Sequence, residues 1–223
     1  MTPSPHLKTG ILHAARGSDA PPTGPSGDAT GVPYGRPPHP SGGSGLPGGL
    51  SDDRGALMIE AQILPTPTGP LSLLSHEGVL VAAGFTADPD EMLARVSPAL
   101  RALGMTRVED LGHAAQAVRD YLDGDLKALD GVAVSQPGSP RRQRLLTALR
   151  EVPPGATVTY AELAERAGMP RTAARAAGGA CAQNLIAPFV PCHRVLPSTG
   201  GYGGYYYGTP VKQWLLAHEA GTA

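Results

Sequence analysis

A cysteine and a histidine are adjacent near the carboxyl-terminal end of the chain, in a Pro-Cys-His-Arg-Val run at residues 191–195. The thiolate is the reactive form of cysteine, and a thiol with an ordinary pKa of about 8.5 needs a base, a cation or a helix dipole to ionise near neutral pH. A cysteine or histidine alone is more often an inert core residue. Because Cys192 and His193 follow the apolar stretch 186–190, which we expect to form a short buried strand, the sequence predicts an activated nucleophile at Cys192.

Upstream of these residues the pattern predicts a helix-turn-helix. Thr159 and Glu162 have the spacing of a capping box, and Gly168 ends the helix that they begin. A second helix is expected over residues 171–183, where almost every residue is small. Two helices joined by a glycine-containing turn are the arrangement with which many proteins place a helix in a groove of DNA.

The second of these helices contains Gly178 and Gly179, each of which costs about 1 kcal/mol relative to alanine in a helix interior. Close approach of another surface would explain that choice, and the surface is either a neighbouring helix or DNA. Arg175 is a long cation among alanines. Because such a side chain can reach into a stack of bases, it favours DNA.

The charges divide unevenly along the chain. The net charge is -1, but residues 136–223 contain nine Lys and Arg against four Asp and Glu, whereas residues 1–135 contain nine against fifteen. Clustered basic residues attract phosphates. Only the carboxyl-terminal part is therefore suited to nucleic acid.

Composition divides the chain into three parts. Residues 1–55 hold ten of the 24 prolines and twelve of the 30 glycines, which indicates a disordered tail with too little apolar surface to fold. A targeting or partner-binding role for the tail stays open. Residues 56–136 predict a small structural domain without a cluster of catalytic residue types. Residues 137–223 predict a mostly helical, winged-helix or helix-turn-helix-like domain that carries the chemistry.

The fold class expected from these elements is α+β, with a small amino-terminal antiparallel sheet and helices followed by the helical domain. Short apolar runs between turn residues predict antiparallel strands over residues 59–64, 70–74 and 79–83. Apolar positions at helical spacing predict helices over residues 89–103 and 113–122. An extended linker at residues 132–137 then leads to a helix over residues 139–152, capped by Ser139.

Neither a membrane nor a metal is expected as a partner. No apolar run approaches the roughly 20 residues of a membrane span, and the amino terminus lacks the apolar stretch of a secretory signal. Two cysteines, Cys181 and Cys192, are too few for a disulfide framework, which favours a reducing, cytoplasmic compartment. We expect no bound metal and no cofactor, because the only nitrogen ligands before Cys181 are isolated histidines, namely His6, His13, His39, His76 and His113.

The run at residues 191–195, together with Arg175, Asn184, Tyr205 and Glu219, resembles the O6-alkylguanine-DNA alkyltransferases, also called methylated-DNA-protein-cysteine methyltransferases. The resemblance covers residues 59–219, loosely in the first domain and closely from Gly155 onward. It implies direct-reversal repair, in which an alkyl group passes irreversibly from O6-alkylguanine in double-stranded DNA to the protein. O4-alkylthymine is a second lesion that the resemblance suggests, and the protein would act once, as a monomer associated with the nucleoid.

The resemblance also implies a role for each matching residue. Cys192 would accept the alkyl group, His193 would act through a water as its base, and Glu219 would orient that histidine, as in other nucleophile, base and acid triads. Tyr160 would donate a proton as guanine leaves. The remaining residues are assigned to substrate or DNA binding, namely Ala173, Ala174, Arg175, Gly178, Asn184, Arg194, Tyr205 and Lys212.

Within that group three residues have more specific implied roles. Arg175 would fill the space left when the damaged nucleotide rotates out of the duplex. Asn184 would tie the helix-turn-helix to the active-site segment, and Tyr205 would line the base pocket. Tyr206 and Tyr207 stand where relatives have smaller residues, so we expect either a narrower pocket or a differently placed loop. Cys181 is expected to be a packed structural thiol.

Two other functions fit parts of this pattern. An alkyltransferase-like protein would flag lesions without repairing them, but such proteins usually lack the nucleophile, and this chain retains Cys192, His193 and Glu219. A helix-turn-helix regulator would need no Cys-His adjacency and would normally dimerise on a two-fold site. The sequence contains no recognisable dimerisation helix, which favours the repair function.

Overall fold

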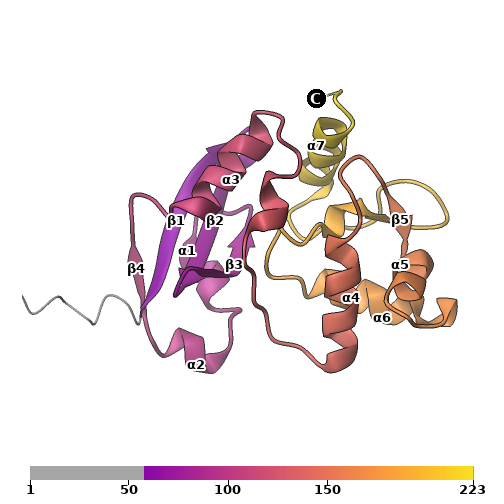
Figure 1. The fold of residues 1–223 in the computed structure, drawn as a ribbon, viewed down its shortest axis with the longest axis horizontal. Coiled ribbons are helices and arrows are strands. Elements are labelled where there is room, and N and C mark those ends of the chain that lie inside the picture. Colours follow the sequence, from indigo (N-terminus) through magenta and orange to yellow (C-terminus); the bar gives the residue numbers. More distant parts are fainter. Residues whose placement is uncertain (1–57, 223) are drawn as a thin grey trace, which may run out of the picture. The chain divides into compact units, whose positions relative to one another are not determined.

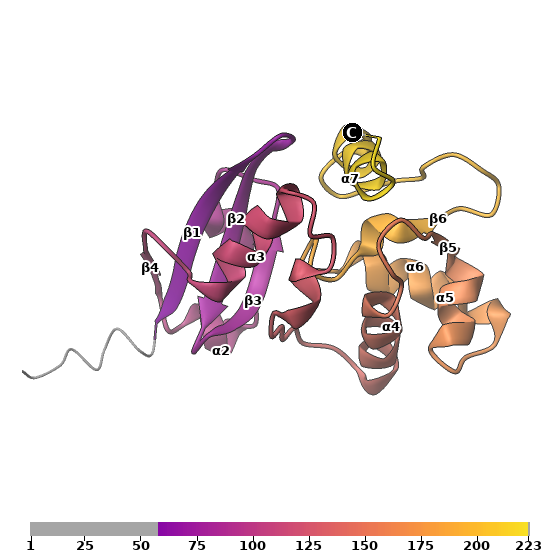
Figure 2. The ribbon, with the colours of Figure 1, turned by 45° about the horizontal axis from the view of Figure 1, so that its top comes forward.

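The computed structural model describes residues 58–222 of the 223-residue chain. The tail expected over residues 1–55 therefore lies outside the described residues. Figures 1 and 2 show the described part from two directions, with its helices and strands labelled.

A four-stranded sheet forms the first half of the described chain (Figure 1). The three predicted antiparallel strands are confirmed as β1 (Ile59–Thr66), β2 (Gly69–His76) and β3 (Val79–Gly84). A fourth strand, β4 (Met105–Arg107), pairs with β1 in parallel. It was not predicted, because three residues are too few to show an alternation of apolar and polar side chains. The order across the sheet is β3-β2-β1-β4.

Two short helices take the place of the single helix predicted over residues 89–103, so that prediction is wrong. The first, α1 (Pro89–Leu93), ends well before α2 (Pro98–Arg101) begins. The residue before a proline avoids the helical conformation, and Ser97 instead caps α2 by accepting a hydrogen bond from the N–H of Leu100 at 3.3 Å. By contrast, α3 (His113–Leu122) has the predicted bounds.

Helices cover both faces of the sheet (Figure 1). On one face, Met92 of α1 packs with Leu74 and Val81. On the other face, α3 packs against β1, and this apolar cluster, which includes Leu71 and Leu73 of β2, continues through α4, α5 and α7. One core therefore joins the sheet to the segments that carry the candidate chemistry.

The second half is mostly helical and contains the predicted helix-turn-helix. Ser139 caps α4, where its hydroxyl accepts from the N–H of Arg142, and Thr159 and Glu162 form the predicted capping box at the start of α5. The helices are α4 (Pro140–Arg150), α5 (Tyr160–Arg166), α6 (Ala174–Ala182) and α7 (Thr209–Glu219), with short 3₁₀ turns η2 (Ala128–Gly131), η3 (Arg171–Ala173) and η4 (Cys192–Arg194). A small parallel sheet of β5 (Val158–Thr159) and β6 (Val195–Leu196) was not predicted.

The predicted strand over residues 186–190 is wrong. Ile186 makes only a single bridge to Ala83 of β3, and the chain then bends so that the N–H of Val190 donates to the carbonyl oxygen of Ile186 at 2.8 Å. Pro188 and Pro191 have no N–H to donate to a strand partner, so the segment cannot continue a ladder.

The observed fold class is α+β, as predicted. All described residues belong to one compact unit, and its apolar core crosses residue 136. The boundary near residue 136 stays a prediction, based on composition and chemistry.

Candidate active site

Cys192 lies at the first position of η4, immediately after the bend, and is a free, half-buried cysteine. Its N–H donates to the carbonyl oxygen of Val190 at 2.8 Å, which fixes the backbone before the thiol. The thiol lines a cavity of about 310 Å³. The walls of this cavity, which we call the reaction pocket, come from α5, α6 and the loop before α7, and the lining residues are Tyr160, Gly178, Cys181, Ala182, Asn184, Cys192, Gly204, Tyr205, Tyr206 and Tyr207.

Asn184 connects the end of α6 to the thiol. Its side chain is buried, and its Nδ2 donates to the carbonyl oxygen of Val190 at 2.7 Å and to Sγ of Cys192 at 3.2 Å. A donor aimed at sulfur stabilises the thiolate more than the thiol. Burial raises the pKa of the Cys192 thiol, and the Asn184 hydrogen bond and the charge of Lys212 oppose that effect without cancelling it. The thiol therefore needs a base to react at neutral pH.

The next residue in the chain, His193 of η4, can act as that base, and it is completely buried against α7. Its Nε2 lies 2.8 Å from Oε1 of Glu219. Burial lowers the pKa of His193 despite the nearby carboxylate, so the ring is neutral and its Nε2–H donates to Glu219. Nδ1 then carries the lone pair, and it has no hydrogen-bond partner among residues 58–222. That nitrogen is available to accept a proton.

Glu219 is the centre of a buried polar network. Besides His193, its carboxylate accepts hydrogen bonds from Arg194, with Nη2 at 2.8 Å, and from the hydroxyl of Tyr121 at 3.0 Å. Burial alone would raise the pKa of Glu219, but the hydrogen bonds from His193 and Arg194 lower it far below its usual range. The carboxylate is thus ionised and holds the imidazole in one orientation.

Tyr160 and Tyr205 line the reaction pocket together with Cys192. Burial, followed by the nearby sulfur atoms of Cys181 and Cys192, raises the pKa of Tyr160, so its hydroxyl keeps its proton at neutral pH. Burial also raises the pKa of Tyr205. Both hydroxyls can donate, and Tyr160 is at the first position of α5, where the capping box fixes the backbone.

Arg194 and Lys212 are placed differently from what the sequence suggests. Both were assigned to substrate or DNA binding, yet they are only 3% and 1% exposed. Arg194 donates hydrogen bonds to the carboxylate of Glu219, and Nζ of Lys212 donates to the carbonyl oxygen of Val195 at 2.8 Å. Since each cation already has buried partners, neither can reach a phosphate from this position, and we correct that assignment. Ala173 is also buried and offers no surface to DNA.

Three of the α6 residues assigned to DNA binding are at least partly exposed. Arg175 is exposed, and Ala174 and Gly178 are partly exposed. A side chain added at Gly179 would meet nothing within 4 Å, and one at Gly178 would only reach ordinary contact with Tyr160 at 3.9 Å. Packing among residues 58–222 therefore does not require either glycine, so a neighbouring helix in this part of the chain does not explain the choice of glycine.

The structure places Tyr206 and Tyr207 in the wall of the reaction pocket, as expected. The guanidinium of Arg95 lies 4.1 Å from the centre of the Tyr206 ring. The Tyr207 hydroxyl fits against Gly84, where any side chain would collide with it. Cys181 also lines the pocket, and burial raises the pKa of its thiol well above the ordinary range, as for a packed thiol.

Sequence reasoning missed three residues that contribute to this site. Tyr121 is an ordinary core position on the apolar face of α3, with nothing to mark its hydroxyl as a partner of Glu219. Gln136 contacts Asn184 from the linker, and Arg142 contacts Gln136 from α4. Both precede the motif by about fifty residues, and neither belongs to a recognisable pattern.

Within residues 58–222, no three His, Cys, Asp or Glu side chains are grouped so that they could hold a metal ion. No helix in the same range is long and apolar enough to cross a membrane.

Comparison with known proteins identifies the family. A family model of the 6-O-methylguanine DNA methyltransferase, DNA binding domain, matches residues 140–221. The methylated-DNA--protein-cysteine methyltransferase of Shigella flexneri is 34% identical over 166 residues, which cover 73% of this chain and 96% of that protein. The crystal structure of Mycobacterium tuberculosis O6-methylguanine methyltransferase has a TM-score of 0.60 and 30% identity, covering 74% of this chain and 95% of that one. A structure of Mycobacterium tuberculosis OGT in complex with DNA is 29% identical, with a TM-score of 0.60 and the same coverage. The chain belongs to the methylated-DNA--protein-cysteine methyltransferase family.

Proposed function

We propose that Cys192 is the residue through which this chain repairs DNA by direct reversal, taking the alkyl group from O6-alkylguanine in a duplex. The observation that carries the proposal is that Asn184 donates to the sulfur of Cys192 at 3.2 Å while the next residue in the chain, His193, is held by Glu219 at 2.8 Å. A thiol with an ordered base beside it is the arrangement of a nucleophile. O4-alkylthymine, which carries its alkyl group on a similar exocyclic oxygen, is a second candidate substrate.

The proposed step balances within the residues of the site. The Cys192 thiolate attacks the alkyl carbon, so that a C–S bond forms while the C–O6 bond breaks and its electron pair passes to guanine. The thiol proton moves through a water molecule to Nδ1 of His193. Tyr160 gives its phenolic proton to the departing guanine, and the proton on His193 returns to Tyr160 through solvent. The thioether is stable, so each molecule acts once.

The damaged base must leave the duplex to reach the reaction pocket. Gly178 and Ala182 line this pocket, whereas Gly179 and Ala176 line a second hollow that includes Arg141 of α4. α6 therefore presents small side chains between the pocket and a basic part of α4, where a DNA backbone can approach closely. Arg175 is exposed on this helix and can occupy the space of the extruded base.

A monomer suffices for this function, because one chain supplies the nucleophile, the base, the carboxylate and the DNA-facing helix. We also propose a cytoplasmic, nucleoid-associated location, on the basis of the DNA substrate and the two free cysteines.

A mass measurement tests the transfer itself. Incubation with a duplex that contains O6-methylguanine should add one methyl group per protein molecule, located at Cys192, in a single stoichiometric burst. The control is the same duplex with unmodified guanine, which should leave the mass unchanged. An unchanged mass with the lesion duplex, while the protein still binds it, would contradict repair and favour lesion flagging.

A second prediction separates base extrusion from chemistry. Arg175→Ala should slow repair of the duplex lesion roughly 10- to 100-fold, since a few kcal/mol of unpairing and unstacking are no longer offset. Its reaction with O6-methylguanine as the free base should stay unchanged, because no base has to be extruded. Single-turnover rates with the two substrates measure the difference.

Arg171→Ala is the matched control. Arg171 is an exposed arginine of the same helix-turn-helix, but it is paired with Glu165. Loss of the Arg171 side chain removes an equal charge. It should slow both reactions by less than threefold, which corresponds to a free-energy change below roughly 0.6 kcal/mol. Equal losses of duplex repair in R171A and R175A would rule out a specific role for Arg175.

A further inference from the structure

Gln136, at the end of the linker before α4, lies directly behind Asn184. Its side chain is buried, with 8% of the residue exposed. Its Nε2 donates to Oδ1 of Asn184 at 2.9 Å, and its Oε1 accepts from the N–H of Leu185 at 3.0 Å. The linker residue therefore contacts the amide that contacts the nucleophile.

Arg142 of α4 extends this series by one residue. Its Nη2 donates to Oε1 of Gln136 at 3.0 Å and to the carbonyl oxygen of Gln183 at 2.6 Å, and its Nη1 donates to the carbonyl oxygen of Pro137. All of these acceptors are uncharged, and no carboxylate of residues 58–222 lies within 4 Å of the guanidinium. Its charge is thus not neutralised by an ion pair with the described part of the chain.

These hydrogen bonds all run in one direction, and we call the series of Arg142, Gln136 and Asn184 the amide relay. Arg142 donates to Gln136, Gln136 donates to Asn184, and Asn184 donates to the sulfur of Cys192. Hydrogen bonds in a series polarise one another, so a cation at one end strengthens the donor at the other.

The relay also determines which end of the Asn184 amide faces the sulfur. Oδ1 of Asn184 accepts from Gln136 and from the N–H of Ile186 at 3.2 Å, so two donors face the oxygen. A rotated amide would place NH₂ against those two donors and its oxygen against the carbonyl of Val190 and the sulfur. Without Gln136, only the N–H of Ile186 would favour the observed orientation of the Asn184 amide.

We propose that Gln136, supported by Arg142, is a positioning residue for alkyl transfer, because it keeps the Asn184 amide in the orientation that donates to the Cys192 sulfur. This inference rests on the proposed function of Cys192 as the nucleophile.

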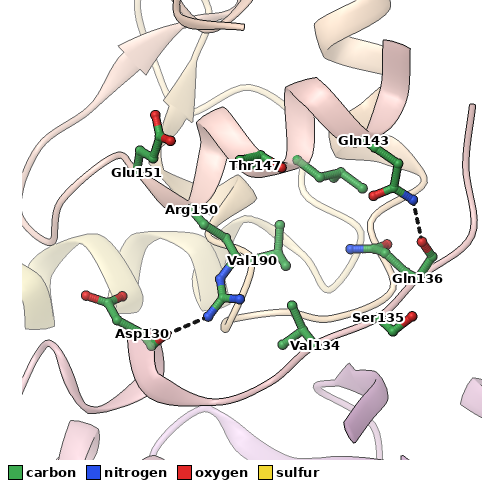
Figure 3. A pocket seen from close by; sticks show the side chains of 10 residues that line it. Asp130, Val134, Ser135, Gln136, Gln143, Thr147, Arg150, Glu151 and Val190 are labelled. Carbon is green, nitrogen blue, oxygen red and sulfur yellow. Dashed lines mark hydrogen bonds between the residues drawn. The ribbon is translucent and has the colours of Figure 1, made fainter. Parts of the chain in front are cut away.

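A large cavity beside the relay provides space for another side chain at position 136. Figure 3 shows this cavity, with a volume of about 670 Å³, between α4 and the linker. Gln136 and Val190 are on its wall, and Nε2 of Gln143 donates to the main-chain oxygen of Gln136 at 2.6 Å. The backbone of Gln136 is thus held separately from its side chain, and a side chain of similar length can be accommodated without crowding the core.

Three methionine variants test the proposal, because methionine has a length similar to that of glutamine and cannot form its hydrogen bonds. Gln136→Met breaks the relay in its middle, and Arg142→Met breaks it at its outer end. Gln143→Met is the matched control, since it removes a hydrogen bond to the backbone of Gln136 but leaves the relay complete.

The readout is the rate of Cys192 alkylation by iodoacetamide as a function of pH, quantified at Cys192 by fragmentation mass spectrometry so that Cys181 is not counted. Methyl transfer from O6-methylguanine duplex is measured in parallel. Because iodoacetamide needs no lesion, its profile tests the relay even if the chain fails to transfer a methyl group, and the two hypotheses can fail separately.

Other groups around the sulfur also titrate, and they stay the same in all four proteins. They come from α5, α6, η4, the loop before α7 and α7 itself, namely Tyr160, Cys181, His193, Tyr205, Tyr207 and Lys212. A difference between the variant and wild-type profiles therefore reports the change in the relay.

In Q136M we expect the midpoint of the pH–rate profile to rise by about one pH unit and the rate at neutral pH to fall about tenfold, as for a weakened hydrogen bond to a charged group. The rate at high pH should stay within about threefold of wild type, because the thiolate then forms without help. A merely structural defect would lower that plateau and leave the midpoint in place.

R142M should shift the midpoint in the same direction by less, and Q143M should match wild type. An unchanged midpoint in both Q136M and R142M would overturn the proposal, as would an equal shift in Q143M. If Q136M does not fold, R142M decides alone.

Discussion

Cys192→Ala should abolish methyl transfer while leaving the affinity for DNA within about threefold of wild type. The variant removes the one atom that forms the new bond, so the single-turnover rate should drop by roughly 10⁴-fold or more, as for other covalent nucleophiles. Binding is expected to survive, because Cys192 is in the reaction pocket and Arg175 is on the exposed face of α6. Methyl transfer is followed by mass and DNA binding by fluorescence anisotropy.

Cys181→Ala is the control for this experiment. Cys181 lines the same reaction pocket, but burial raises the pKa of its thiol well above the ordinary range, and no histidine is adjacent to it. C181A should therefore transfer at close to the wild-type rate. If transfer persisted in C192A and disappeared in C181A, the acceptor would be Cys181, and the assignment to Cys192 would be wrong.

Glu219→Gln should slow methyl transfer by roughly 10²- to 10⁴-fold at neutral pH, an effect similar to that of neutralising the carboxylate in other triads. The carboxylate accepts from His193 and Arg194, and an amide cannot accept from both without turning its NH₂ toward one of them. Arg194 would also become a buried cation without a counter-charge, so the free energy of unfolding should fall by about 3–5 kcal/mol. Single-turnover kinetics and urea unfolding measure the two effects.

The same substitution should change how stability depends on pH. The pKa of Glu219 is lower in the folded chain than its ordinary value of 4.5, so the folded state favours the ionised form. This contribution is fully present above the unfolded pKa and is lost as pH falls below 4.5 toward the folded value. Between roughly pH 6 and pH 3, wild type should therefore lose more stability than E219Q.

Tyr121→Phe is the matched control for Glu219, since it removes a single hydrogen bond to the same carboxylate. We expect a loss of about 1 kcal/mol in stability and less than a tenfold loss of rate, because His193 and Arg194 stay in place. If Y121F were as slow as E219Q, the network as a whole, and not the orientation of His193, would determine the rate.

Local chemistry was the part of the site that could be predicted. The capping box at Thr159 and Glu162 and the antiparallel hairpins involve neighbouring residues, whose preferences can be read directly. The adjacency of Cys192 and His193 likewise predicts the candidate nucleophile from two neighbouring residues. These features need no information about distant parts of the chain.

What could not be predicted depends on tertiary contacts. A sequence marks Arg194 and Lys212 as cations, and cations are normally exposed, so their burial could not be inferred before Glu219 and the Val195 carbonyl were seen beside them. The apolar composition of residues 186–190 predicts a strand, but the prolines in this segment limit pairing and the chain bends instead. Gln136 is 48 residues from Asn184 in sequence, and an isolated glutamine in a linker gives no signal.

The contacts of β3 have a consequence for how the chain folds. An outer strand with free N–H and C=O groups is a template for aggregation, and most proteins cover it. Here the N–H of Ala83 donates to Leu185 at 2.8 Å, and its carbonyl oxygen accepts from Ala187 at 3.0 Å. The segment that leads to Cys192 thus covers this edge of the sheet. Cutting the chain near residue 136 would remove these partners and expose an aggregation-prone strand edge, so we expect the first half to be unstable on its own.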